Sequence, residues 1–471
     1  MSGTFWNDRE VRSAMGLRGG QDDLSYGGVS TDTRSIGDGD LFVALEGENF
    51  DAHAFIRQAA DSGARGAVVS EEVDAPDGMA LYRVDDTLIA LGQLAHYRRE
   101  RLNATLVGVA GSNGKTTTKE LIRAVLSTRL RTYATAGNLN NRIGVPLTLL
   151  GVPDDAQAVV VEMGTNRPGE IAMLTEIVRP NVLAITSVGE EHLELLGDLE
   201  GVLDEETDAL KGLDDAGNAY VAEDPPELPR RAREMIGRRR VHVAGVGSAA
   251  DIRPDGGERG IRVLEDGSTT WAWRGLEVRL PLPGRFNVRN ALIALGIGLE
   301  LGIPSEEAVR ALASVKLPKL RGEWQRYGDL RVLADCYNSN PPSLEAAIDL
   351  LGSLPTRGRR VAVLGTMREM GAAAAQVHAT AADRIAAQLG NRIDLVVATG
   401  DFVDAFERHR EKFGDQLVSA ADPVEAYDAA LPQLRPTDTI LLKASRGDKL
   451  ERWLPLLERD FGPPVVTDDK F

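Results

Sequence analysis

A glycine-rich segment in the first third of the chain has the residue types of a phosphate-binding loop. An apolar run ends at Gly111, and Gly114, Lys115, Thr116 and Thr117 then open a helical pattern. Glycines let backbone N–H groups approach anionic oxygens, and the helix that follows presents its positive end to them. A lysine supplies a point charge for the outer phosphates, and a threonine hydroxyl can bind Mg²⁺. The segment therefore predicts binding of a nucleoside triphosphate.

The spacing of this loop departs from the common one. Five positions before Gly114 the chain has Val109 where a P-loop ordinarily has glycine, so we expect a shortened variant. The alternative is a glycine-rich turn from strand to helix that carries a surface lysine. The predicted nucleotide-binding set of this segment is Gly111, Ser112, Asn113, Gly114, Lys115, Thr116 and Thr117.

Polar residues that follow other apolar runs are candidate metal ligands. Glu162 ends a valine run one strand away from the loop, where a carboxylate can hold Mg²⁺ directly or through water. It could equally be a strand-end carboxylate that caps a turn. His192 follows the next apolar run and is either a second metal ligand or a solvated loop histidine.

Asparagine-rich and hydroxyl-rich segments predict further binding sites. Residues 137–141 are dense in amides, which offer both donors and acceptors to a neutral ligand, although an Asx-turn cluster has the same composition. Residues 31–34 are either a turn with a capping aspartate or a contact for a diphosphate and a sugar. Residues 335–342 could meet a ribose or the triphosphate, and Arg446 could clamp a carboxylate.

Strands and helices alternate along the whole chain and must position these residues. Near the N-terminus we expect strands at 41–45 and 66–70, with helices at 52–63 and 87–99. In the middle of the chain, runs of buried parallel-strand type occupy 159–162 and 182–186. An antiparallel insert is expected at 241–280, a long helix at 287–301 and a proline-rich loop at 225–229.

The last third of the chain repeats the strand–helix rhythm. Four apolar strands are expected at 331–335, 360–365, 395–400 and 439–443, which favours a doubly wound, Rossmann-like sheet with functional residues at the strand ends. The predicted fold is α/β with three domains, at residues 1–102, 103–318 and 319–471.

Composition limits the class of protein. The chain has 471 residues and a formal net charge of −17, and this charge would repel nucleic acid and anionic membranes. A single cysteine, Cys336, is typical of a reducing compartment. Neither a signal peptide nor an apolar run of membrane-spanning length is evident. We therefore expect a cytoplasmic protein, monomeric, with no nucleic-acid partner and no membrane insertion.

Taken together, these segments resemble the Mur ligase family over nearly the whole chain. The central domain carries the resemblance at 111–121, 137–141, 143–149 and 161–166. The remaining matches lie in the outer domains, at 30–34, 39–45, 51–53, 335–341, 365–371 with His378, and 443–447.

The resemblance implies an N-terminal UDP-binding domain, a central ATPase domain and a C-terminal ligase domain. It also implies a reaction in which ATP and Mg²⁺, two ions being expected, join D-alanyl-D-alanine to UDP-N-acetylmuramoyl-tripeptide through an acyl phosphate. Positioning and charge neutralisation would supply most of the catalysis.

Roles for individual residues follow from the same resemblance. Lys115 would hold the outer phosphates, Thr116 and Glu162 one Mg²⁺, and His192 the second. Asn290 would contact adenine, while Arg321 and Asp335 would hold ATP from the domain junction. Substrate contacts would come from Thr31, Arg34, Asn138, Asn140, Asn141, Asn166, Asn338, Ser445 and Arg446.

One departure from the family pattern concerns the second metal. The family usually has a carbamylated lysine about fourteen residues after the metal-binding histidine, where this chain has Glu206. A glutamate keeps the negative charge and the oxygens on a shorter stem, so we expect Glu206 to replace the modified lysine. A solvated acidic face within 204–208 is the alternative. Arg167 and Phe286 also stand where histidines are common in the family.

Rival functions remain open from sequence alone. A sister ligase could add a diamino acid one step earlier, or a related ligase could extend folate with glutamate. The amide-rich segment 137–141 favours the dipeptide-adding reaction. A P-loop NTPase acting as a switch belongs to a different class and would leave the two outer domains unexplained.

Overall fold

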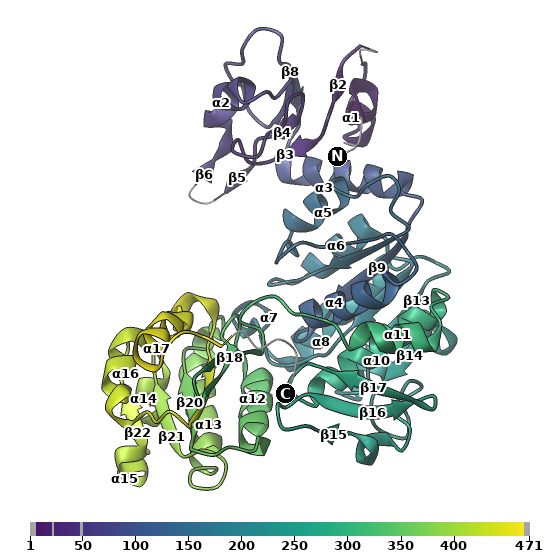
Figure 1. Ribbon diagram of the computed structural model, residues 1–471. Helices are drawn as coiled ribbons and strands as arrows, with labels where there is room; N and C mark the ends of the chain where they lie inside the picture. Colours follow the sequence, from purple (N-terminus) through teal and green to yellow (C-terminus); the bar gives the residue numbers. More distant parts are fainter. Residues whose placement is uncertain (1–5, 21–22, 48–49, 466–471) are drawn as a thin grey trace.

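Three mainly parallel sheets follow one another along the chain and define three α/β domains (Figure 1). The computed structural model describes residues 6–20, 23–47 and 50–465. Both outer domains contact the central one, and they lie at its opposite ends (Figure 1). The predicted fold class is confirmed.

The N-terminal domain is built on a four-stranded parallel sheet in the order β3-β4-β7-β8. The strands and helices expected at 41–45, 66–70, 52–63 and 87–99 are confirmed. The domain consists of β1 (Trp6–Asn7), α1 (Asp8–Ala14), β2 (Ser25–Tyr26), β3 (Val29–Ser30), β4 (Leu41–Val43), β5 (Glu46–Gly47), β6 (Phe50–Asp51), η1 (Ala52–Phe55), α2 (Ile56–Asp61), β7 (Gly66–Val69), β8 (Ala80–Arg83) and α3 (Thr87–Arg101).

The central domain has a six-stranded parallel sheet in the order β10-β11-β9-β12-β13-β14. Strand β9 (Thr105–Ala110) therefore lies between β11 (Ala158–Glu162) and β12 (Val182–Ile185), and the chain leaves its carboxyl end as the predicted phosphate loop. The other strands are β10 (Thr132–Ala134), β13 (Asn218–Ala222) and β14 (Val241–Ala244). In open parallel sheets, ligands bind at this carboxyl edge, where the strand order reverses.

Helices cover both faces of this sheet, and a small antiparallel sheet follows it. The helices are α4 (Lys115–Leu126), α5 (Gly144–Leu150), α6 (Glu170–Val178), α7 (Leu193–Leu196), α8 (Leu199–Asp208), α9 (Glu227–Ile236), α10 (Phe286–Glu300) and α11 (Ser305–Leu312). The antiparallel strands are β15 (Arg262–Val263), β16 (Thr269–Trp273) and β17 (Leu276–Leu280).

Two expectations for this domain are wrong. The predicted antiparallel insert begins too early, because 241–244 form β14, a parallel edge strand of the main sheet. The antiparallel part of the insert is confined to β15, β16 and β17. The predicted loop at 225–229 contains the start of α9. Pro229 fits there because the first turn of a helix has no intrahelical partner for its N–H groups.

The C-terminal domain has a six-stranded sheet in the order β18-β19-β23-β20-β21-β22, with only β18 antiparallel. The four predicted strands are β19 (Leu330–Asp335), β20 (Arg360–Leu364), β21 (Leu395–Ala398) and β23 (Thr439–Lys443), and they are confirmed. The prediction missed β18 (Glu323–Tyr327), an edge strand with mostly polar residues, and the three-residue β22 (Leu417–Ser419). Helices α12 (Pro341–Ser353), α13 (Ala374–Ala386), α14 (Phe402–Glu407), α15 (Arg410–Phe413), α16 (Pro423–Ala430) and α17 (Trp453–Phe461) surround the sheet.

Buried apolar side chains form separate cores on the two faces of each large sheet. One central core continues into the N-terminal domain through α3, which packs on α5 and α6. The two C-terminal cores share no buried residue with the central ones. No helix among the described residues is long and apolar enough to cross a membrane.

Candidate active site

A large cavity lies between the central and C-terminal domains and collects most of the predicted site residues. Its volume is about 810 Å³, which is within the usual range of small-molecule sites. The predicted residues that line it are Ser112, Asn113, Gly114, Lys115, Thr116, Thr117, Asn138, Asn140, Asn141, Glu162, Asn166, His192, Asn290, Arg321, Asp335, Asn338, Ser445 and Arg446.

Four predicted residues lie outside this lining. Gly111 and Glu206 are buried behind the phosphate loop, where the Gly111 N–H donates to the Glu206 carboxylate at 2.7 Å. Thr31 and Arg34 lie in the N-terminal domain. The Arg34 side chain pairs with Asp32, and hydrogen bonds from Arg34 lower the pKa of that exposed carboxyl to about 2.

Backbone geometry explains why glycines occupy the phosphate loop. Gly111 has φ +116°, and a Cβ there would lie 2.7 Å from the backbone nitrogen of Thr186. Gly114 has φ +85° and precedes α4, with the Asn290 side chain directly against it. Residues with a Cβ rarely adopt such conformations, so the loop can pass this close to β12 and α10 only as glycine.

Lys115 folds back on the loop that carries it. Its ammonium group donates to the carbonyl oxygens of Gly111 and, at 3.1 Å, of Ser112. Burial opposes its charge, but Glu191, Glu206 and Glu162 outweigh burial and raise the pKa of Lys115 above its ordinary value. The lysine is therefore held as a cation at the mouth of the loop.

Glu162 is a candidate ligand for a cation whose side chain is fixed by hydrogen bonds to its neighbours. Its Oε1 accepts hydrogen bonds from the Thr116 hydroxyl at 3.1 Å and from the Asn140 amide at 2.9 Å. Its Oε2 is buried without a hydrogen-bond donor and lies 3.5 Å from the ammonium group of Lys119. Carboxylate and hydroxyl oxygens are the ligands that Mg²⁺ prefers, so Thr116 and Glu162 fit that ion.

Sequence reasoning missed Glu191, which is buried beside the predicted metal-binding histidine. Its carboxylate lies 3.9 Å from the Lys115 ammonium group and 3.8 Å from Nε2 of His192. Burial raises the pKa of Glu191, against the opposing effect of Lys115. Its position immediately before His192 was the available signal, but burial of an acid cannot be deduced from that position alone.

The His192 ring meets carboxylates on both of its nitrogens. Its Nδ1 lies 2.5 Å from Oε2 of Glu369, which belongs to the segment 365–371 of the C-terminal domain but for which no individual role was predicted. Burial opposes protonation of the ring, but Glu369 and Glu191 outweigh burial and raise the pKa of His192. Among the described residues, Glu162, His192 and Glu206 do not converge on one compact metal cluster.

Glu206 is buried, so the alternative of a solvated acidic face is wrong for this residue. Burial raises the pKa of its carboxyl to about 7. The neighbouring Glu205 is also buried and accepts hydrogen bonds from the Thr165 hydroxyl and from the N–H groups of Gly169 and Ile171. These two acids therefore support the loops that follow β9 and β11.

The C-terminal domain contributes cations and an aromatic ring to the cavity. Asp335 and Lys443 end neighbouring strands and pair at 2.9 Å. The Tyr337 ring has the Arg321 guanidinium 3.9 Å above it and that of Arg446 at 5.8 Å. Lys443 and Tyr337 belong to segments that the sequence analysis had singled out, but their individual roles were not predicted.

Together, the fold and the site define an enzyme that uses a nucleoside triphosphate and builds its site across two of three α/β domains. Models of the Mur ligase family match all three domains: the family's catalytic domain at 25–99, its middle domain at 109–298 and its glutamate ligase domain at 320–446. The chain belongs to the Mur ligase family, whose members are ATP-dependent ligases.

Individual proteins show the same similarity. The UDP-N-acetylmuramoyl-tripeptide–D-alanyl-D-alanine ligase of Bacillus subtilis is 35% identical over 430 residues, which cover 90% of this chain and 91% of that protein. A crystal structure of MurF from Acinetobacter baumannii has 29% identity and a TM-score of 0.87, covering 98% of this chain and all of that one. MurF of Thermotoga maritima in complex with ADP has 26% identity and a TM-score of 0.78, covering 92% and 97% of the two chains.

Proposed function

We propose that this protein joins D-alanyl-D-alanine to UDP-N-acetylmuramoyl-tripeptide, with conversion of ATP to ADP and phosphate, in cytoplasmic synthesis of peptidoglycan precursors. The similarity to ligases of that name supports the substrates. The observation that carries the proposal is the single cavity that joins the phosphate loop to Ser445 and Arg446 of the C-terminal domain. A monomeric enzyme is part of this proposal.

The chemistry requires two successive steps. A carboxylate oxygen of the tripeptide attacks the γ-phosphorus of ATP, and ADP leaves. The amine nitrogen of the dipeptide then attacks the carbonyl carbon of the acyl phosphate, phosphate leaves, and the nitrogen loses a proton. Neither step needs a covalent bond to the protein, so orientation and charge neutralisation supply the rate enhancement.

Residues of the central domain would act on the phosphates. The loop N–H groups and Lys115 would hold the outer phosphates, with Asn290 placed for the base. Mg²⁺ held by Thr116 and Glu162 would neutralise phosphate charge, and a second ion is proposed at His192. Glu162, Glu191 and Glu206 lie around Lys115, so cations bound with the triphosphate would also offset the charge of these carboxylates.

Residues around the rest of the cavity, together with two residues of the N-terminal domain, would hold the two substrates that are joined. The amide group of Asn140 and those of Asn138, Asn141 and Asn166 would line the acceptor side, with Thr31 and Arg34 on the UDP moiety. Ser445 and Arg446 would hold the dipeptide carboxylate, Arg321 and Asp335 the nucleotide, and Asn338 a substrate oxygen.

Glu206 is proposed to supply the negative charge that a carbamylated lysine supplies in related enzymes. Its contact with the Gly111 N–H supports a role behind the loop, and direct ligation of a metal stays a prediction. We expect Glu206→Ala to lower activity even at saturating Mg²⁺. Unchanged activity would contradict the proposed role.

Phosphate release in the presence of ATP and UDP-muramoyl-tripeptide tests the proposed function. D-alanyl-D-alanine should stimulate release and should appear in the product by mass spectrometry. Stimulation by a diamino acid with the corresponding dipeptide substrate would instead identify the sister reaction. Stimulation only by glutamate with folate would overturn the proposal, and hydrolysis independent of any acceptor would indicate an NTPase switch.

A further inference from the structure

Helix α7 lies at the junction of the central and C-terminal domains, and His192 immediately precedes it (Figure 1). The short helix η5 (Gly371–Ala373) of the C-terminal domain packs against this helix. The backbone N–H of Glu194 donates to the carbonyl oxygen of Glu369 at 3.3 Å. A Cβ added to Gly371 would lie 2.8 Å from Cα of Glu194, so the two backbones are in close contact.

The two side chains that meet across this junction are both carried on unusual backbone. His192 has φ +50° and Glu369 has φ +66°, in the left-handed region that residues with a Cβ seldom adopt. Such conformations persist where the surrounding structure determines them. The close packing at Gly371 supplies this constraint, and it holds the Glu369 carboxylate at an ion-pair distance of 2.5 Å from Nδ1 of His192, without the geometry of a hydrogen bond.

His192 lines the cavity, and its other ring nitrogen, Nε2, lies near a second carboxylate. Nε2 of His192 lies 3.8 Å from Oε2 of Glu191, and Oε1 of the same carboxylate is buried without a hydrogen-bond partner, 3.9 Å from the Lys115 ammonium group. An imidazole nitrogen and a neighbouring carboxylate are both ligands that divalent cations accept. Histidines that bind metals commonly donate the N–H of their other nitrogen to a carboxylate, which fixes the ring orientation and increases its basicity.

We propose that Glu369 is a positioning residue that orients His192 for a divalent cation at Nε2. This role rests on the proposed function in so far as that function requires the second cation. Because Glu369 belongs to the C-terminal domain, the ring is oriented only while that domain is docked on α7. The cation site of the central domain thereby depends on a side chain from its neighbour.

Direct binding of Mn²⁺ tests this role without turnover. The full-length enzyme is titrated with Mn²⁺ in the presence of a non-hydrolysable ATP analogue, and free Mn²⁺ is followed by electron paramagnetic resonance. We expect Glu369→Ala to weaken one class of bound Mn²⁺ by about 10- to 100-fold. Glu369→Gln keeps an oxygen that can accept from Nδ1, so its loss should be smaller than that of the alanine variant.

Glu194→Gln is the matched control, because it removes one carboxylate from the same junction without touching His192. It should bind Mn²⁺ as the wild type does. If Glu369→Ala binds both classes of Mn²⁺ with affinities within twofold of the wild type, the proposal is overturned. If the alanine variant does not fold, the Mn²⁺ affinities of Glu369→Gln are compared with the wild type by the same criterion. The phosphate-release assay on the wild type tests the proposed function separately.

Discussion

Lys119 lies beneath the phosphate loop with its side chain fully removed from solvent. Its ammonium group donates to the carbonyl oxygens of Thr135 at 2.9 Å and Gly137 at 3.4 Å, and it lies 3.5 Å from Glu162. One buried cation therefore links the candidate Mg²⁺ ligand to the segment that carries the cavity asparagines. Its position one turn after Lys115 did not reveal this, because burial of a lysine depends on what packs over it.

Loss of this buried cation should be costly. In Lys119→Met the carboxylate of Glu162 keeps its burial but loses its charged partner, and breaking a buried pair in this way costs about 3–5 kcal/mol. We expect the free energy of unfolding, measured with guanidinium chloride, to fall by that amount. Lys211→Met is the control, since Lys211 forms an exposed pair with Asp208 and its loss should cost less than about 1 kcal/mol. Equal effects of the two substitutions would contradict this account of Lys119.

At the scale of elements, a glycine of the phosphate loop and a glycine before α6 separate two properties of this residue type. Gly111 and Gly169 both have positive φ, at +116° and +81°. Around Gly169 there is open space, whereas a Cβ on Gly111 would meet the backbone of Thr186 and Ser187 at 2.7 and 2.9 Å. The first glycine therefore combines conformational strain with a steric limit, and the second has the strain alone.

A pair of alanine substitutions separates these properties. Gly169→Ala should lower the free energy of unfolding by about 1–2 kcal/mol, the cost of a left-handed backbone with a Cβ. Gly111→Ala should cost more, because the loop must also move away from β12, and it should weaken ADP binding at least tenfold by calorimetry. If ADP binds equally well to both variants, the close approach of the loop to β12 is not what shapes the site.

Helix α1 is attached to the N-terminal sheet through two buried tyrosines. The Tyr26 and Tyr82 hydroxyls are 2.6 Å apart, and the Tyr82 hydroxyl donates to Asp8. Burial raises the pKa of Tyr26 to about 12 and that of Tyr82 further still. Both hydroxyls therefore stay protonated in the folded state at pH values where the unfolded chain has begun to ionise.

This difference predicts a loss of stability at alkaline pH. Below pH 10 both states hold the protons, and the contribution of the tyrosines is fully present. Between about pH 10 and 12 the unfolded state releases them first, so the free energy of unfolding should fall by up to about 1.4 kcal/mol per pH unit for each tyrosine. Tyr26→Phe should make this slope shallower by up to about 1.4 kcal/mol per pH unit in urea titrations at several pH values, while Tyr82 and the other buried tyrosines keep their contribution. An unchanged slope would show that Tyr26 ionises normally.

The elements that could be predicted from the sequence are those whose own residues form a recognisable pattern. The apolar runs of β9, β11 and β12 and the residues that directly follow them could be predicted, because a parallel strand buried on both faces reads as continuous hydrophobic sequence. The edge strand β14 was assigned to the wrong sheet, and the edge strand β18 was missed. An edge strand has a neighbour on one side only, so its sequence need not be a continuous hydrophobic run. Glu191 and Glu369 could not be found because their roles come from contacts between distant segments.

At the scale of the whole molecule, the two outer domains are attached differently. The buried core of the N-terminal domain continues into the central domain through α3. The C-terminal cores are separate from the central ones, and Leu193 of α7 is a partly buried residue that packs against both. Few shared apolar contacts mean a low resistance to relative motion, so the C-terminal domain is the one expected to move.

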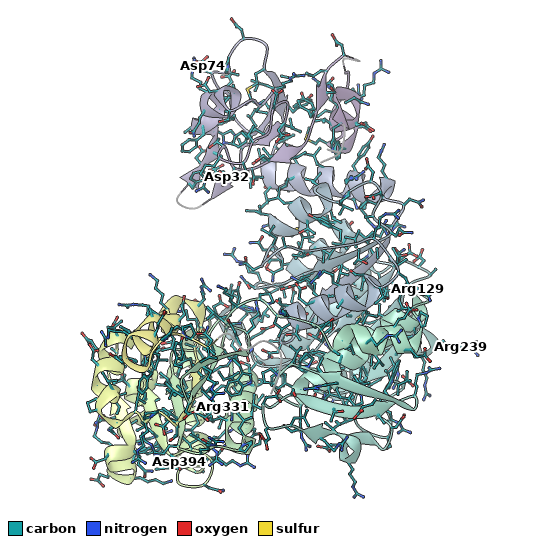
Figure 2. All side chains as sticks on the ribbon, in the orientation of Figure 1. Asp32, Asp74, Arg129, Arg239, Arg331 and Asp394 are labelled. Carbon is teal, nitrogen blue, oxygen red and sulfur yellow. The ribbon has the colours of Figure 1, made fainter. Side chains whose placement is uncertain are left out.

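Binding of ATP analogue, Mg²⁺ and UDP-tripeptide should therefore bring the C-terminal domain toward the phosphate loop. Dyes on cysteines introduced at the exposed positions Arg239 (Figure 2) and Glu411 would report this motion by energy transfer, and a pair at Asp77 and Arg239 would report the N-terminal domain. The native Cys336 can stay, because burial raises the pKa of its thiol to about 12 and keeps it unreactive. We expect the efficiency of energy transfer to increase more for the Arg239–Glu411 pair than for the Asp77–Arg239 pair. In Lys115→Ala, which cannot hold the phosphates, we expect no increase. A larger change for the second pair would mean that the continuous core through α3, and not the separated one, contains the hinge.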